Sequence, residues 1–132
     1  MNILVIDGMG GGIGKAVIEQ IRSISNDAVI TAVGTNSIAT SAMLKAGAHN
    51  AATGENAVVY NAGKADYIIG VIGIIAANSM HGEVSPKMAQ AVSASPAHKI
   101  LIPMDKCNIT VAGVVSASIQ TYIGDVVEKL RG

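Results

Sequence analysis

The stretch Asn2–Lys15, NILVIDGMGGGIGK, joins an unbroken apolar run to a loop with five glycines between positions 8 and 14. The apolar run predicts a central β-strand that is buried on both faces. After the loop, Val17, Ile18 and Ile21 recur at helical spacing, which predicts an amphipathic helix. A strand, a glycine turn and a helix in this order predict that the chain opens an α/β fold.

The rest of the chain continues to alternate strand-like and helix-like segments, which is typical of a parallel sheet covered by helices. Further strands are predicted at 28–34, 66–73 and 99–104, and helices at 36–47, 55–62, 86–95 and 119–131. Residues 108–114, NITVAGV, alternate apolar and small or polar side chains and predict a fifth strand. The connection before it is too short for a parallel crossover, so we expect an antiparallel edge strand. The predicted fold is a three-layer, Rossmann-like α/β domain over residues 1–132, with a mostly parallel sheet of about five strands.

Composition excludes several classes of function. Nine basic and nine acidic residues cancel without forming a block of like charge, so neither nucleic acid nor a membrane surface is an expected partner. Cys107 is the single cysteine, and the first residues lack the pattern of a signal peptide. We therefore expect a cytoplasmic protein. No spacing of His, Cys and carboxylate residues resembles a zinc site, so no metal is predicted.

The glycine loop is suited to a phosphate group. Glycine removes the Cβ atoms that keep an anion away from backbone N–H groups, and a helix N-terminus adds partial positive charge. Asp7, at the end of the strand, is expected either to hold a ribose hydroxyl or a metal, or only to cap the turn. Lys15 is expected to pair with an anion or with Glu19, one helical turn away. The candidate ligand-binding residues of this segment are Asp7, Gly8, Gly10, Gly11, Gly12, Gly14 and Lys15.

The spacing of the glycines does not select one known type of loop. The dinucleotide pattern GxGxxG is absent, whereas Gly8-xxx-Gly12-Ile13-Gly14 resembles the turn of the short-chain dehydrogenases. Tyr60 and Lys64 are spaced like the catalytic pair of that family, but they precede the third predicted strand, which is the wrong place. The P-loop pattern also fails, because Met9 replaces its first glycine and Ala16 its metal-binding hydroxyl. The expected cofactor stays open between NAD(P) and another nucleotide.

Over nearly its whole length the chain resembles a family of small bacterial proteins that is defined only as a domain of unknown function with a Rossmann-like fold. The resemblance rests on IDGMGGGIGK, GTNSIATSAMLKAGA, ATGENAVVYNA, ADYIIGVIGI, NSMHGEVSPKMA, KILIPM and CNITVAGV. It implies a fold, and it implies no activity, cofactor or catalytic residue.

Other candidate residues follow the carboxyl ends of the predicted strands, where ligands bind in open α/β sheets. Thr35 and Asn36 begin a helix and are expected either to hold a second phosphate or only to cap that helix. Asn78 and Ser79 lie in a loop after the third strand, together with His81 and Glu83. His81 and Glu83 are the acid–base candidates, and a solvated pair in a loop would explain them equally.

Three functional hypotheses follow. The first is a protein that binds a nucleotide or another phosphate-bearing ligand on the Gly8–Lys15 loop without chemistry. The second is an enzyme that acts on a nucleotide or sugar phosphate through His81 or Glu83. The third is a structural subunit of a homo-oligomer, in which the glycines serve only close packing.

Overall fold

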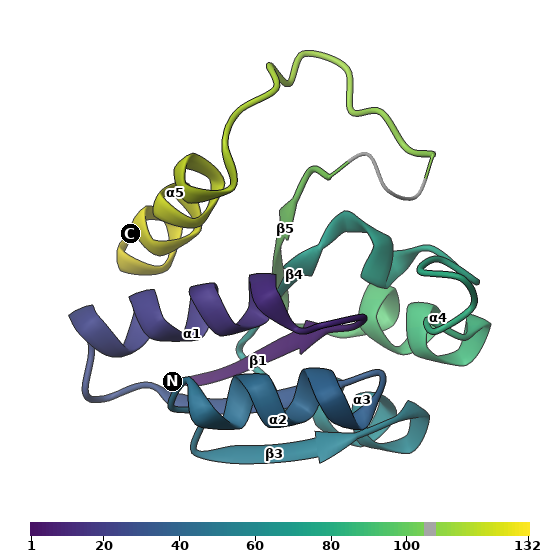
Figure 1. Ribbon diagram of the computed structural model, residues 1–132, viewed down its shortest axis with the longest axis horizontal. Helices are drawn as coiled ribbons and strands as arrows, with labels where there is room; N and C mark the ends of the chain where they lie inside the picture. The colour runs from purple at the N-terminus through teal and green to yellow at the C-terminus, as the bar shows by residue number, and fades with distance from the viewer. Residues whose placement is uncertain (105–107) are drawn as a thin grey trace.

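A computed structural model describes residues 1–104 and 108–132, and it shows a parallel β-sheet covered by helices on both faces (Figure 1). The strands are β1 (Asn2–Asp7), β2 (Val29–Gly34), β3 (Asn50–Thr53), β4 (Tyr67–Val71) and β5 (His98–Ile102). The helices are α1 (Gly12–Ile24), α2 (Ser37–Lys45), α3 (Glu55–Ala62), α4 (Pro86–Ala94) and α5 (Ile119–Arg131), and a short 3-10 helix, η1 (Ile72–Ile75), follows β4. The chain therefore has the predicted three-layer, Rossmann-like α/β fold.

The strand order is β3-β2-β1-β4-β5, and all four pairings are parallel. β1 is central, as its apolar run predicts, and five of its six residues are buried. The chain moves outward from β1 to β3 and then crosses to β4 on the other side of β1. Such a switch point leaves a crevice at the carboxyl ends of the central strands.

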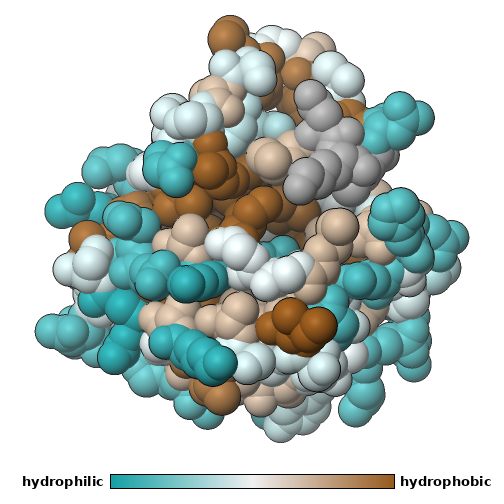
Figure 2. Space-filling view, viewed as in Figure 1, coloured by the Kyte–Doolittle hydropathy of each residue, from teal (hydrophilic) through white to brown (hydrophobic). Residues whose placement is uncertain are grey.

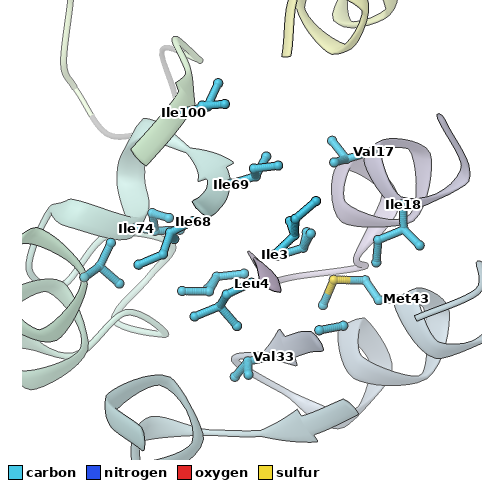
Figure 3. Packing of buried hydrophobic residues seen from close by; sticks show 14 of the residues in the cluster. Ile3, Leu4, Val17, Ile18, Val33, Met43, Ile68, Ile69, Ile74 and Ile100 are labelled. Atoms are coloured by element: carbon cyan, nitrogen blue, oxygen red, sulfur yellow. The ribbon is translucent and has the colours of Figure 1, made fainter. Parts of the chain in front are cut away.

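The two helical layers follow from the connections between strands. α1 packs against both α2 and α5, whereas α3 packs against α4 on the opposite face of the sheet. The core consists of small aliphatic side chains, because the sequence has no Phe and no Trp. Figure 3 shows Val17 and Ile18 of α1 and Met43 of α2 on the side of β1 where the Ile3 side chain lies, whereas the Leu4 side chain lies on the other side. None of the described helices is long and apolar enough to cross a membrane.

The predicted helix boundaries are supported by capping side chains. The Asn36 side chain accepts a hydrogen bond from the Ala39 N–H at 2.9 Å and so caps α2. Ser85 caps α4 in the same way, with Pro86 as the first helical residue, where its missing N–H costs nothing. Ser118 caps α5 by accepting from the Thr121 N–H at 3.2 Å.

The predicted antiparallel edge strand at 108–114 is wrong. Residues 108–114 form no strand, and the edges of the sheet are β3 and β5. Asn108 (φ 56°) and Gly113 (φ 85°) both have left-handed backbone, which interrupts the extended conformation that the alternating side chains suggest. The sheet reaches five strands through β3, which lies between the helices predicted at 36–47 and 55–62.

Met43 tests how strongly the α1–α2 contact supports the fold. Its side chain is fully buried, while Leu44, the next residue in the same helix, is 51% exposed. Met43→Ala leaves a cavity between α1, α2 and the sheet, and it is expected to lower the free energy of unfolding by about 2–5 kcal/mol. Leu44→Ala is expected to change it by about 0.5 kcal/mol or less. Urea denaturation of both variants measures the difference, and equal midpoints would contradict this account of the core.

Candidate ligand pocket at the glycine loop

A pocket of about 460 Å³ lies at the switch point, beside the carboxyl ends of β1 and β4. Its volume is within the range of pockets that hold small ligands. We call it the glycine-loop pocket. It is lined by Asp7, Gly8, Met9, Gly10, Gly11, Gly12, Ile13, Ala16, Val71, Met80, Met104, Ile119 and Gln120. Figure 2 shows apolar residues gathered in a hollow on this face of the molecule.

Asp7 joins the two ends of the glycine loop. The residue is 6% exposed, and its Oδ1 accepts a hydrogen bond from the Gly8 N–H at 2.8 Å. Its Oδ2 accepts from the Gly14 N–H at 2.6 Å, in the first turn of α1. Because a buried carboxylate needs such donors, the pair of bonds fixes the loop between the strand and the helix. The structure thus supports the capping role of Asp7.

Three glycines of the loop are required by close contacts within the protein. An ideal Cβ on Gly8 would lie 2.5 Å from the Thr35 Oγ1, and one on Gly14 would lie 2.5 Å from the Met43 Sδ. Gly11 has φ 75°, and a Cβ there would lie 2.8 Å from the Ala39 Cα. These glycines allow the loop, α1 and α2 to pack closely.

Close contacts within the protein do not explain why positions 10 and 12 are glycine. A Cβ on either residue would meet no atom within 4 Å, and neither has left-handed backbone. Both line the glycine-loop pocket. Glycine at these two positions leaves the backbone open to whatever enters the pocket.

The same segment presents free backbone donors. Within the described part of the chain, the N–H groups of Gly10, Gly12 and Ile13 donate to no protein acceptor. The first N–H groups of a helix have no partner within the helix, and they attract negative charge. An anion in the pocket would therefore meet three donors together with the N-terminus of α1.

Glu83 holds the glycine loop from the opposite side. Its Oε1 accepts hydrogen bonds from the Met9 N–H at 2.9 Å, the Thr35 hydroxyl at 2.5 Å and the Asn36 side-chain amide at 3.2 Å. The bond from Met9 contributes most to lowering the pKa of Glu83 below its ordinary value of 4.5, followed by the bond from Thr35. Desolvation opposes this effect, while Asn36 and the charge of His81 add to it. Glu83 is thus held in its ionised form by the groups that it connects.

Thr35 and Asn36 are already engaged within the protein. Asn36 caps α2 through its side-chain oxygen, and its amide also donates to the Met9 carbonyl at 3.0 Å. Thr35 donates to Glu83. Neither residue lines the glycine-loop pocket. Of the two predicted roles, helix capping is the one for which the hydrogen bonds provide evidence.

The loop 76–85 brings the remaining candidates near the pocket. Ser79 donates to the Gly73 carbonyl at 2.6 Å, and the Asn78 N–H donates to the Val84 carbonyl at 2.7 Å. Asn78, Met80 and His81 all have left-handed backbone, with φ between 55° and 66°. Of these residues Met80 lines the pocket, whereas His81 is exposed beside it.

Lys15 does not line the glycine-loop pocket. Its side chain borders a separate, shallow groove between α1 and α2, together with Glu19, Ser37 and Lys45. The exposed side chains of Tyr60, in α3, and Lys64, just after the end of that helix, contact each other. Cys107 lies outside the described residues. Among the residues that the structure describes, no group of three His, Cys, Asp or Glu side chains could hold a metal ion.

The apolar walls of the pocket were not predicted from the sequence. Met80 comes from the loop 76–85, Met104 follows β5, and Ile119 and Gln120 begin α5. These residues share no motif or period, so only the fold brings them together. Met9 is the one apolar wall residue whose place in the glycine loop could have indicated, from the sequence, that it lines the pocket.

The chain belongs to the family described as domain of unknown function DUF3842, whose model matches residues 2–132. No curated protein is similar enough to count as a match. Among solved structures, the chain is similar to a dodecameric FMN-dependent UbiX-like decarboxylase from Escherichia coli O157:H7. The identity is 12%, the TM-score is 0.45, and the match covers 98% of this chain and 95% of the decarboxylase.

The Glu83 hydrogen bonds predict a specific dependence of stability on pH. A carboxylate whose pKa is lowered on folding stabilises the native state above its ordinary pKa, and this contribution is lost as the pH falls through the lower, native value. Glu83→Gln is expected to lower the free energy of unfolding by about 1–2 kcal/mol at neutral pH. The difference from the unmodified protein is expected to shrink as the pH falls below 4.5.

Thermal unfolding between neutral pH and about pH 3 measures this difference. Glu19→Gln, on the exposed face of α1, is the matched control and is expected to show no such change. If the loss of stability caused by Glu83→Gln stays constant over this pH range, the role assigned to the carboxylate is contradicted.

Proposed function

We propose that this protein binds a small phosphate-bearing ligand, with the phosphate on the loop between Gly8 and Lys15. The observation that carries the proposal is the set of free N–H groups at Gly10, Gly12 and Ile13, of which the two glycines have no Cβ to cover the backbone. Phosphate is the biological anion that such glycine-rich helix N-termini accept.

The electrostatics of the pocket define how the ligand would be held. Of the described residues that line it, Asp7 is the one with a charged side chain, and both of its carboxylate oxygens accept N–H groups of the loop. No described Lys or Arg side chain lines the pocket. Among the described residues, the backbone amides of the loop and the dipole of α1 are the groups that would bind the phosphate.

An enzymatic role is the second proposal, and His81 is the residue that supports it. His81 follows Met80, which lines the pocket, and its charge acts on Glu83. The Glu83 carboxylate already connects three groups, so we assign it a positioning role and leave acid–base chemistry to His81. NAD(P) as the specific cofactor has no support from the family or from the pocket.

Matched glycine variants test phosphate binding. Gly12 lies in the first turn of α1 and lines the pocket, whereas Gly124 lies in α5 away from it, and both have open space around an added Cβ. Valine and glycine have similarly modest helix propensities, so neither Gly12→Val nor Gly124→Val is expected to unfold the protein. Gly12→Val is expected to abolish phosphate binding, because its side chain would cover the free donors. Gly124→Val is expected to bind like the unmodified protein.

Binding is measured by titrating ¹⁵N-labelled protein with AMP and ribose 5-phosphate, each paired with its unphosphorylated counterpart. We expect the phosphate form to bind about tenfold or more tightly and to shift the amide signals of Gly10, Gly12 and Ile13. The proposal fails if neither phosphate shifts these signals, or if Gly12→Val binds like Gly124→Val.

A further inference from the structure

We infer that the glycine-loop pocket takes a planar aromatic ring together with the phosphate, so that the ligand is a phosphate ester that carries an aromatic ring rather than a simple sugar or polyol phosphate. This inference rests on the proposed phosphate site and specifies the class of its ligand. It is carried by the side chains that line the part of the pocket beyond the loop.

Those side chains are apolar and come from four separate segments. Met9 belongs to the glycine loop, Met80 to the loop 76–85, Met104 to the segment after β5, and Ile119 to the start of α5. Val71, at the end of β4, adds a fifth segment, and all of these residues line the same pocket as Gly10, Gly12 and Ile13. Methionine thioethers make favourable contacts with aromatic rings, and their flexible side chains adapt to a flat surface.

The backbone around two of these methionines is unusual. Met9 has φ 54° and Met80 has φ 56°, a conformation that residues other than glycine, asparagine and aspartate rarely adopt. Met9 is held by the bond from its N–H to Glu83, and the Glu83 N–H donates to the Met80 carbonyl at 3.0 Å. One short segment therefore fixes both methionines at the mouth of the glycine loop.

The pocket offers little to the hydroxyl groups of a sugar. Among the described lining residues, Asp7 and Gln120 have the only polar side chains, and the Asp7 oxygens are engaged by the loop. A hydroxyl that loses water without gaining a partner weakens binding by about tenfold, and a polyol phosphate carries several. An aromatic ring loses no hydrogen bonds from its faces when it enters such a space.

Phosphate monoesters of equal charge test the inference, because their phosphate contribution is the same. Phenyl phosphate is the aromatic probe without hydroxyl groups, AMP and FMN are aromatic probes that keep those of a ribose or ribityl chain, and the polyol probes are ribose 5-phosphate and glycerol 3-phosphate. We expect at least one aromatic probe to bind about tenfold or more tightly than both polyol probes in calorimetric or NMR titrations.

Variants of the apolar walls separate the ring from the phosphate. Met80→Ala and Ile119→Ala, which lie on different segments, are each expected to weaken the best aromatic probe by about fivefold or more while leaving ribose 5-phosphate unchanged. Val115→Ala, at a residue that is 84% exposed and outside the pocket, is the control and is expected to change neither. Two wall variants are used, so that the test can still be decided if one of them fails to fold.

The outcomes distinguish this inference from the proposed function. If polyol and aromatic phosphates bind equally to the unmodified protein, the phosphate site stands and the inference is wrong. If the wall variants weaken both classes of probe equally, the inference is also wrong. If no phosphate of either class binds and Gly12→Val has no effect, the proposed function fails and the inference fails with it.

Discussion

The hydrogen bonds of the Asp7 carboxylate are the interaction on which the glycine loop depends. A carboxylate this deeply buried is stable only when its oxygens accept hydrogen bonds, and it takes the N–H groups of Gly8 and Gly14, one at each end of the loop. Gly14 also lacks the Cβ that would lie 3.0 Å from the Cβ of Asp7, so the helix can approach the strand end. In the loop that results, the N–H groups of Gly8 and Gly14 are satisfied, whereas those of Gly10, Gly12 and Ile13 donate to no acceptor within the described residues. The same contact that joins strand and helix therefore holds the segment on which the proposed phosphate site rests.

Glu83 is a second carboxylate that holds the glycine loop by accepting hydrogen bonds, from the other side of the crevice. Its single oxygen Oε1 links the glycine loop, the end of β2 and the N-terminus of α2 to the loop 76–85. Gly8 makes room for this arrangement, since a Cβ there would lie 2.7 Å from that oxygen. The acid–base candidate of the sequence thus has a positioning role for which the geometry provides evidence. The two carboxylates together hold the pocket without the help of a described basic side chain.

The sequence predicts this fold best where one segment carries its own signals. β1 and β4 are apolar runs, α4 has Ser85 and Pro86 at its start, and α5 has a continuous apolar stripe, so their positions could be read directly. β3 has the sequence NAAT, with too few apolar or β-branched side chains to be recognised, and it is a strand because its backbone pairs with β2. At residues 108–114 the opposite happened, since a strand was predicted where none forms. Alternating side chains indicate a strand, but they do not reveal the left-handed backbone at Asn108 and Gly113. The glycine-loop side of the pocket comes from one local segment and could be predicted, whereas its apolar walls depend on tertiary structure.

The central position of β1 also shapes the route by which the chain folds. β1 is synthesised first and can pair with β2 early, but its second neighbour, β4, comes much later, and the contact between the Asn2 N–H and the Asp66 carboxylate spans 64 residues. Until β4 is made, one edge of this central, buried strand has no partner. Unpaired apolar edges are templates for pairing with other chains, and contacts between distant residues form slowly. The strand that precedes the glycine loop is therefore open to pairing with other chains during synthesis, until β4 covers its second edge.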